Sequence, residues 1–330
     1  MQGNNVFILI KRAILYLLLF GGAALFLIPL LWMLSTALKP IEQTMTMPPQ
    51  WIPYRHYVEI DGERVAARPG PAYQEDGREW IRVMPEGEED WRVVPADEVE
   101  RAVSPRWENF GDAIRAMRYF PQYLRNTLVL VILTVIGTVS SSALAAYGFS
   151  RIDWRGRNRV FLIALATMMI PFPVIMVPMY TLFQTIGWIG TLRPLWVPTF
   201  FAQAFNIFLL RQFFLTIPKD LSDAARIDGC GEFRIFMQII LPLCKPALLV
   251  VGLFQFMTTW NDFLGPLIYL TEQENFTLAL GLQFFQSQHG GTEWHYLMAA
   301  STIVVLPVIV LFFFAQRQFI EGISMTGVKG

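Results

Sequence analysis

The stretch DAARIDGCGEFRIFMQIILPLCKP, residues 223–246, lies between two long apolar segments, yet its first half carries charged and small residues. Pro218 stands at a suitable helix start, and Asp220 and Ser222 are residue types that cap a helix N-terminus. Gly229 allows the positive φ that commonly ends a helix. The pattern predicts a short helix followed by a sharp turn, not another crossing of a membrane.

The residues after this turn have a helical period of their own. Phe233, Phe236 and Ile240 recur at three- and four-residue spacing, which is typical of one face of an amphipathic helix. Pro242 is expected to end this second helix. Taken alone, such a helix–turn–helix is also compatible with an internal bracket that only connects two spans.

The composition of the whole chain indicates a membrane protein. Of 330 residues, 54% are hydrophobic and 16% charged, and the mean hydropathy is +0.42; soluble domains carry roughly 25% charged residues. The net charge of zero argues against a nucleic-acid-binding protein. Cys230 and Cys244 fall on the predicted cytoplasmic side, where thiols stay reduced, so neither a disulfide nor a metal site is expected.

Six apolar runs are long enough to be candidate membrane helices. The first follows Lys11 and Arg12, but its run is longer than that of a signal peptide, so we interpret it as a retained anchor. Gln203 and Asn206 interrupt the fourth. The six runs are Ala13–Leu34, Thr127–Phe149, Val160–Leu182, Leu195–Leu210, Leu248–Leu270 and Leu297–Phe314.

Lys and Arg residues set the orientation of the predicted spans. With the N-terminus inside, 13 of them lie in the inside segments, and only Arg193 lies in the two short outside loops. The bias predicts that both termini are cytoplasmic. The long segment between the first two spans then lies outside.

Several predicted spans contain helix breakers, which are tolerated at membrane depth where neighbouring helices or a watery cavity satisfy the backbone. The third contains Pro171, Pro173 and Pro178, and the fifth contains Gly265-Pro266. These two spans are therefore candidates for lining a pathway, with a simple kink as the alternative; for Pro307 in the sixth span we prefer the kink. The polar or aromatic pathway candidates in the fifth span are Trp260, Asn261 and Asp262, although a structural hydrogen bond explains the carboxylate equally well.

A seam of small residues marks the second span. Gly137, Ser141 and Ala145 recur at four-residue spacing. Small side chains at this spacing allow another segment to approach the helix closely. We expect the seam to be a packing surface.

The segment between the first two spans has the composition and turn signals of a soluble module. Asp61-Gly62 between two β-prone runs is a strong hairpin signal. WIRVMPE and WRVVPAD resemble two copies of one strand-and-turn unit. Residues 54–106 are therefore predicted to form a small, acidic, β-rich module, either a solvated spacer or a docking surface. The sequence after it, from Trp107, predicts an amphipathic helix leading into the second span.

Several kinds of chemistry have no residues to support them. A phosphate-binding loop ends in Gly-Lys-Ser/Thr, and none of the five lysines follows a glycine. The three histidines lack zinc-ligand spacing. Asp262 is the only carboxylate inside a predicted span. An ion-coupled carrier usually needs several charged groups at membrane depth, so one carboxylate is weak evidence for that class. The chain is therefore not expected to be an enzyme.

The opening stretch resembles the signature of permease subunits of binding-protein-dependent ABC importers, which has the form EAA, three residues, Gly, nine residues and I-x-L-P. Here it reads Asp223-Ala224-Ala225, Gly229 and Ile239-x-Leu241-Pro242, with Asp in place of the usual Glu. ARIDG, TMMIPFPVIMVPMY, FLLRQFF, WNDFLGPL and the terminal GISMTGVKG are similar to the carbohydrate branch, in particular to the smaller permease of maltose-type transporters. The resemblance covers almost everything outside residues 54–106.

This resemblance implies an all-α polytopic membrane protein of six transmembrane helices, with a coupling helix that docks into a separate ATPase and a β-rich insertion between the first two helices. Its division would be a tail and first helix (1–53), the insertion (54–106) and a five-helix permease core (107–330) with a coupling loop at 211–245. The implied coupling residues are Asp223, Ala224, Ala225, Asp228, Gly229, Ile239, Leu241 and Pro242.

The resemblance also implies partners. They are a second permease subunit, an ATPase dimer that binds ATP and magnesium in place of this chain, an extracytoplasmic substrate-binding protein and membrane lipid, with no nucleic acid. The location would be the cytoplasmic membrane of a bacterium or archaeon, and the substrate a sugar or oligosaccharide whose identity the sequence leaves open. Two other classes stay open from the residues alone: a stand-alone channel or secondary carrier, and a membrane-anchored binding or scaffold protein that acts through residues 54–106.

Overall fold

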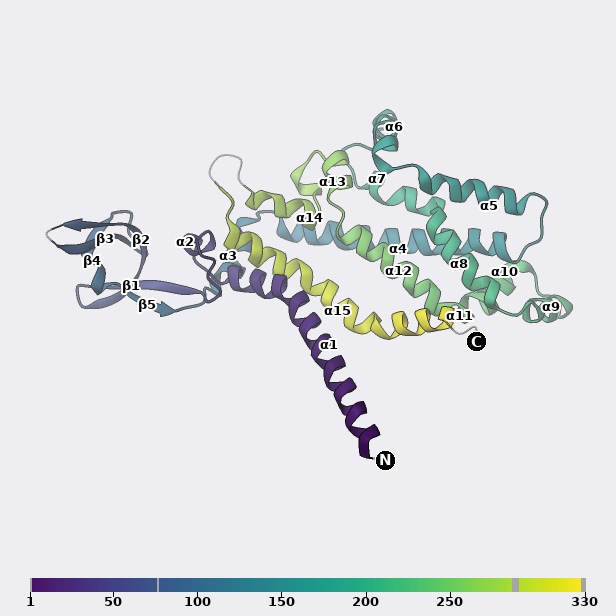
Figure 1. Cartoon of the computed structure of the whole chain (residues 1–330). Coiled ribbons are helices and arrows are strands. Elements are labelled where there is room, and N and C mark those ends of the chain that lie inside the picture. Colours follow the sequence, from purple (N-terminus) through teal and green to yellow (C-terminus); the bar gives the residue numbers. More distant parts are fainter. Residues whose placement is uncertain (1, 76, 287–290, 328–330) are drawn as a thin grey trace. The chain divides into compact units, whose positions relative to one another are not determined.

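The computed structural model describes residues 2–75, 77–286 and 291–327, and it consists mainly of helices with one small sheet (Figure 1). Its contacts divide the chain into two compact units. The first contains the residues up to Met117 together with Phe284–Val305, and the second contains Arg118–Gln283 and the residues from Leu306 onward.

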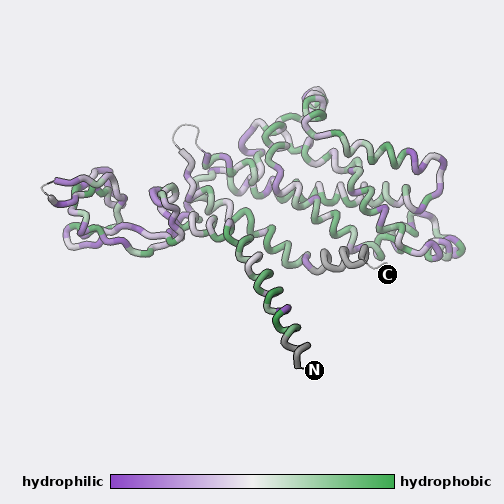
Figure 2. The backbone as a smooth tube through the Cα atoms, viewed as in Figure 1, coloured by the Kyte–Doolittle hydropathy of each residue, from purple (hydrophilic) through white to green (hydrophobic). Residues whose placement is uncertain are grey.

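The first unit begins with a long apolar helix, α1 (Gln2–Ala37). None of its most apolar stretch is buried, and Phe26 is 85% exposed. Figure 2 shows hydrophobic colour along most of this helix. An exposed apolar surface of this size requires a lipid environment or a partner, and the predicted first span, Ala13–Leu34, lies within it. The remaining elements before the next long helix are α2 (Ile41–Thr44), β1 (Tyr54–Ile60), β2 (Glu63–Glu75), β3 (Arg78–Pro85), β4 (Arg92–Pro95), the 3-10 helix η1 (Ala96–Glu98), β5 (Glu100–Val103) and α3 (Glu108–Ala116).

The five strands form one antiparallel sheet in the order β4-β3-β2-β1-β5. The predicted hairpin is confirmed: Asp61 and Gly62 both have positive φ, 52° and 84°, and join β1 to β2. Positive φ at both central residues gives the turn a twist that matches the flanking strands. Val58 and Val83 form the core of the module, together with Ala67. The two similar WxxV-type runs are β3 and β4, which pair with each other.

The predicted amphipathic helix after the sheet is shorter than expected. Residues Glu108–Ala116 form α3, and a break at Met117 precedes the long helix α4 (Phe120–Ser150). Pro121 lies in the first turn of α4, where a missing N–H costs no hydrogen bond. The second half of the predicted amphipathic helix is therefore the beginning of the next helix.

The second unit is a bundle in which α4 packs against α8 and α12 (Figure 1). Its elements after α4 are α5 (Arg157–Ala166), η2 (Thr167–Met169), α6 (Phe172–Thr185), α7 (Arg193–Trp196), η3 (Val197–Phe201), α8 (Ala204–Thr216), α9 (Lys219–Ile227), α10 (Glu232–Ile235), the π-helix η4 (Phe236–Ile240), α11 (Leu241–Leu243), α12 (Lys245–Trp260), α13 (Leu264–Tyr269), η5 (Gln273–Asn275) and α14 (Leu278–Gly281). The short helix η6 (Leu282–Phe285) contains the boundary between the two units. A last helix, α15 (Trp294–Gly327), begins in the first unit and continues into the second.

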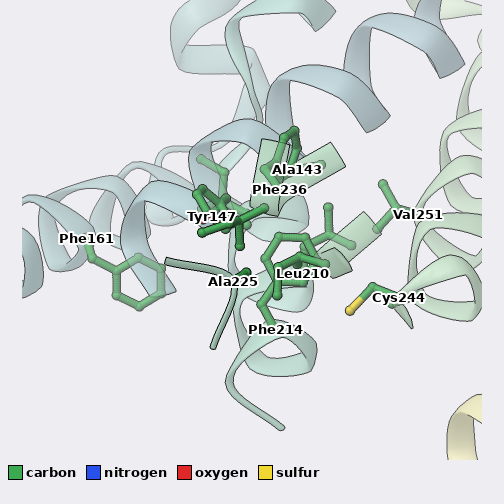
Figure 3. Packing of buried hydrophobic residues seen from close by; sticks show 14 residues of the cluster. Ala143, Tyr147, Phe161, Leu210, Phe214, Ala225, Phe236, Cys244 and Val251 are labelled. Atoms are coloured by element: carbon green, nitrogen blue, oxygen red, sulfur yellow. The ribbon is translucent and has the colours of Figure 1, made fainter. Parts of the chain in front are cut away.

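The core of the second unit lies beneath α9. Tyr147 from α4, Leu210 and Phe214 from α8, and Phe236 from η4 are buried in one cluster, which also receives Ala225 from α9 (Figure 3). Figure 3 shows these side chains converging from helices that are far apart in the sequence. Burial of large apolar groups against α9 holds the short helix on the bundle.

The small-residue seam of α4 is a packing surface, as predicted. A Cβ on Gly137 would lie 2.6 Å from both the ring of Phe200 and Oγ1 of Thr199. The Ser141 hydroxyl donates to the carbonyl oxygen of Thr199 at 3.0 Å and accepts from the N–H of Ala202 at 3.1 Å. The seam therefore lets η3 approach the α4 backbone.

In the described chain, α1, α4 and α15 are single helices long and apolar enough to cross a membrane. Three bent pairs pass the same test: 157–169 with 172–185, bent by 97°; 193–216 with 219–227, bent by 75°; and 232–243 with 245–260, bent by 81°. Counting each pair as one span raises the number to at most six. The first bend falls at Pro171, one of the predicted breakers, whereas Pro307 lies inside a continuous helix.

Candidate functional site

The centre of the candidate site is α9, the helix predicted from the opening stretch. Pro218 occupies its N-cap position, with φ −54° and ψ 137°, and no side chain caps it. Asp220 and Ser222 are thus not caps. Ser222 is instead turned into the protein, where its hydroxyl is buried without a hydrogen-bond partner. The fixed φ of a proline is sufficient to direct the chain into the helix.

The helix ends at Gly229 in a Schellman motif. The N–H of Gly229 donates to the carbonyl oxygen of Arg226 at 3.0 Å, and the N–H of Cys230 donates to that of Ala225 at 2.9 Å. These two bonds require a left-handed residue after the C-cap, Asp228, and Gly229 has φ 79°. The glycine is needed for its conformation, because a Cβ there would meet no atom within 4 Å.

The helical run after the turn differs from the prediction at Pro242. The proline does not end the helix, which continues through α11 and bends only at Cys244. The π-helix η4 directly precedes it. In a regular α-helix a proline ring clashes with the carbonyl group four residues earlier. In a π segment the hydrogen bonds join residues five positions apart, so this clash with the carbonyl group is relieved. The local pattern of apolar residues carried no sign of this change.

An ion-pair network connects α9 to α4. Nη1 of Arg226 lies 2.6 Å from Oδ1 of Asp223, and its Nε lies 2.8 Å from Oε1 of Glu232. The second oxygen of Glu232 accepts from the hydroxyl of Tyr147 at 2.5 Å. Hydrogen bonds with one charged partner are stronger than neutral ones. These bonds therefore connect α9 to α4 through Glu232, in addition to the connection along the chain.

A second charged contact joins the same end of α4 to α8. Nη2 of Arg151 donates to the carbonyl oxygens of Phe214 at 2.5 Å and of Ile217 at 2.6 Å. These carbonyls belong to the last turn of α8, whose dipole favours a cation. Burial lowers the pKa of Arg151, yet a guanidinium stays protonated in proteins. The segment entering α9 is thus fixed to α4 before the helix begins.

Part of the exposed surface of α9 and of the segment that follows it is apolar. Ile227 is 86% exposed, Phe233 is 71% exposed and Leu221 is 44% exposed. Phe233 was predicted to share one face of an amphipathic helix with Phe236 and Ile240, and of these three only Phe236 and Ile240 are buried. Sequence patterning missed this surface because an exposed and a buried phenylalanine look alike in a short amphipathic segment.

The predicted coupling residues fall into two groups. Asp223, Ala224, Asp228 and Gly229 lie exposed on α9 or its turn, and Ala225 is buried in the core beneath them. The second part of the motif lies one helical run later. There Ile239 and Leu241 pack partly against the same core, whereas Pro242 is exposed.

The predicted pathway residues lie apart from α9 along the chain, at the far end of α12. Trp260 is buried and stacks on Phe256 at 5.3 Å between ring centroids. Asn261 donates to the carbonyl oxygen of Met257 at 2.8 Å, and Asp262 accepts from the N–H of Gly265 at 3.0 Å. Both polar side chains therefore make local bonds that support the break between α12 and α13. Among the residues that the structure describes, no cluster of His, Cys, Asp and Glu has the arrangement of a metal site.

The chain matches the model of the binding-protein-dependent transport system inner membrane component over residues 137–324. It belongs to this family. The match begins at Gly137 in α4 and includes α9, the Schellman turn and the motif ending at Pro242. The chain is therefore a membrane permease component of such a transport system.

Several relatives of the permease have known names. It is 39% identical over 212 residues to the arabinooligosaccharides transport system permease protein AraQ of Bacillus subtilis, covering 64% of this chain and 74% of the relative. It is 32% identical over 213 residues to the trehalose/maltose transport system permease protein MalG of Thermococcus litoralis, covering 64% and 77%. It is 31% identical over 241 residues to the maltodextrin transport system permease protein MalD of Streptococcus pneumoniae, covering 72% and 85%.

The fold of the permease also resembles solved structures. A chain of a bacterial ABC transporter involved in the import of the acidic polysaccharide alginate matches with a TM-score of 0.68 over 93% of this chain and 96% of that chain, at 19% identity. A second match, with a TM-score of 0.53 over 63% and 81%, comes from a bacterial alginate ABC transporter in complex with a periplasmic protein that carries an alginate pentasaccharide, at 16% identity. At these identities the likeness extends to the fold alone.

Proposed function

We propose that this permease forms half of the translocation pore of an ATP-driven importer for a sugar or oligosaccharide. Its named relatives belong to transport systems for arabinooligosaccharides, trehalose and maltose, and maltodextrin. A second, different permease subunit would form the other half of the pore. An extracytoplasmic binding protein would deliver the sugar, as in the alginate transporter solved with its periplasmic protein.

In this proposal α9 is the element that couples the pore to a separate ATPase subunit. The observation that carries the proposal is a nine-residue helix, ended by a Schellman turn, with Leu221 and Ile227 exposed and Ala225 buried in the bundle core. Arg226 links this helix through Glu232 to Tyr147 on α4. Ala224 is small and exposed, so a partner surface can approach the helix backbone closely there. Asp223 is already paired with Arg226, which distinguishes it from a free carboxylate waiting for an external cation.

The ATPase itself would be another protein that binds ATP and magnesium. This chain has five lysines, and none follows a glycine as a phosphate-binding loop requires. The chain would therefore transmit the energy of hydrolysis without catalysing it. The mechanical path would run from α9 through Arg226 and Glu232 to Tyr147 on α4.

The same proposal includes six spans and a defined orientation. Each bent helix pair would count as one span of the bundle. Both termini and α9 would lie in the cytoplasm, because Lys and Arg concentrate in the short segments on that side. Residues 54–106 would then lie outside the cytoplasmic membrane of a bacterium or archaeon.

Changing Ile227 to Asp tests the coupling role. The side chain is 86% exposed in the isolated chain, so a polar replacement leaves the fold intact, whereas a carboxylate in an apolar ATPase groove would be desolvated at a cost. Co-purification of the ATPase and substrate-stimulated ATP hydrolysis in proteoliposomes are expected to fall. Ile152→Asp is the matched control, because Ile152 is also exposed, at 37%, but lies in another loop.

Two outcomes would contradict the proposal. One is unchanged ATPase recovery and unchanged transport in Ile227→Asp. The other is substrate uptake by the purified chain alone in proteoliposomes without any ATPase, which would favour a channel or a secondary carrier.

A further inference from the structure

The segment that leaves α1 has an unusual composition for a part of a polar module. Residues 43–53, QTMTMPPQWIP, contain no charged side chain. The charged residues on either side are engaged elsewhere: Glu42, before the segment, lies 3.0 Å from Nε of Arg68, and Arg55, after it, pairs with Glu86 and Glu108. The segment between them is free to enter a medium that does not tolerate charge.

This segment doubles back along the end of α1. The rings of Trp51 and Trp32 meet edge to face at 4.9 Å between centroids, and the hydroxyl of Ser35 donates to the carbonyl oxygen of Trp51. Nζ of Lys39 covers the ring of Trp32 at 3.9 Å, which fixes that indole further. Trp32 precedes the last residue of α1, Ala37, by five positions, which is about 7.5 Å at the helical rise of 1.5 Å per residue.

The polar groups of the segment are turned inward. Gln43 is only 4% exposed; its amide nitrogen donates to the carbonyl oxygen of Ile52 at 2.7 Å, and its amide oxygen accepts from the N–H of Tyr54 at 3.1 Å. The buried glutamine at the start of the loop thereby satisfies two backbone groups at its end. A loop closed in this way does not need water for its backbone there.

The apolar side chains are turned outward. Met47 is 89% exposed, Met45 75%, Ile52 60% and Trp51 49%. This arrangement is the reverse of a soluble loop. It continues the exposed apolar surface of α1, where Leu31 is 52% exposed.

We propose that residues 43–53 form a lipid-contact loop that sits in the headgroup and acyl boundary of the leaflet at which α1 ends. Tryptophan is enriched at this depth because its ring is apolar and its N–H is polar. Met45, Met47 and Ile52 would be buried among lipid chains, and Trp51 would mark the interface. The bilayer, and not a protein, is the occupant that fits, because the loop is continuous with a helix surface that is itself long and apolar enough to span.

The lipid contact has a consequence for the β-module. Tyr54, the first residue of β1, follows the loop directly, and the N–H of Ser104 donates to the carbonyl oxygen of Pro53 at 3.2 Å. Both the entry to the sheet and the exit from it are thus bonded to the loop. Seating the loop in lipid would fix the height of the sheet above the membrane. This role is independent of the transported substrate and of coupling to an ATPase.

A photo-reactive benzoylphenylalanine at Met47, in the full chain within the membranes of expressing cells, tests the proposal. Illumination is expected to give lipid adducts, detected by mass spectrometry, in a yield similar to that from the same probe at Leu18 in the middle of α1. The same probe at Glu89, exposed between β3 and β4, should give almost none. Met45 provides a second probe position if the first variant is not inserted.

Two results would overturn the inference. A dominant cross-link to a protein at both Met45 and Met47 would mean that a partner covers the loop. Adduct yields as low as those at Glu89, with Leu18 labelled normally, would mean that the loop lies in water.

Discussion

Replacing Gly229 by Ala tests the turn that ends α9. The residue has φ 79°, a conformation that costs a residue with a Cβ about 1–2 kcal/mol. No atom lies within 4 Å of the added Cβ, so backbone strain is the only source of the effect. The Schellman turn should open about 5–30 times more often, since 1–2 kcal/mol corresponds to that factor in an equilibrium.

Gly231 provides the matched control two residues later. A Cβ there also meets no atom within 4 Å, but its φ is −73°. The loss of a favoured N-cap residue and the gain of about 0.4–1 kcal/mol from a stiffer unfolded chain should nearly cancel in Gly231→Ala. Asn at position 229 should fall between Gly and Ala, because Asn tolerates the left-handed region although it is larger.

Two measurements test this prediction, one of the stability of the turn and one of the activity of the importer. Hydrogen exchange of the amide of Cys230, which donates to the carbonyl oxygen of Ala225, should accelerate in Gly229→Ala by the factor given above and stay unchanged in Gly231→Ala. In reconstituted importer, substrate-stimulated ATP hydrolysis should fall in the order Gly, Asn, Ala. Equal exchange and equal activity in the two alanine variants would refute the reasoning, as would a larger effect at position 231.

Three further predictions concern packing, charge and pH. Gly137→Ala should destabilise the fold by about 1–3 kcal/mol through overpacking, whereas Gly148→Ala on the same helix meets no atom within 4 Å and should not, as thermal unfolding in detergent would measure. Glu232→Gln removes the carboxylate charge that Arg226 and Tyr147 share and should lower the ratio of transport to ATP hydrolysis. Tyr147→Phe keeps the ion pair between Arg226 and Glu232 and should lower this ratio less. Equal ratios in the two variants would contradict the prediction. Burial lowers the pKa of Lys39 from its ordinary value of 10.5 to about 8. Between these two pH values Lys39 is protonated in the unfolded chain but mostly deprotonated in the folded chain. Stability should therefore rise with pH across this window, and this lysine should make no contribution to the pH dependence below about 8. The rise should be absent in Lys39→Met, and an identical pH profile of the unfolding temperature in both proteins would exclude it.

Much of the fold was predictable because it depends on neighbouring residues. The hairpin at Asp61-Gly62 follows from two residues that accept positive φ, and the end of α9 follows from one glycine. The break at Pro171 and the small-residue seam at Gly137 likewise follow from the geometry of single residue types. The motif spacing between Asp223 and Pro242 was visible in the sequence for the same reason.

The contacts of the candidate site were less predictable. Arg226 is close in sequence to Asp223 and Glu232, but the bond between Glu232 and Tyr147 spans 85 residues and depends on how α4 packs. Pro242 was expected to end a helix, because a local rule does not include a π segment just before it. Asp262 bonds its own turn, which the sequence left as one of two alternatives.

The sequence by itself determined where the chain becomes apolar, where it turns and which short helix carries the permease signature, because these properties depend on side chains within a few positions of each other. Only the tertiary structure decided which side of that helix is free, with Ala225 buried and Ile227 exposed, and which uncharged loop returns to meet Trp32. Exposure and long-range partners depend on the packing of segments distant in the chain, and composition alone does not specify that packing.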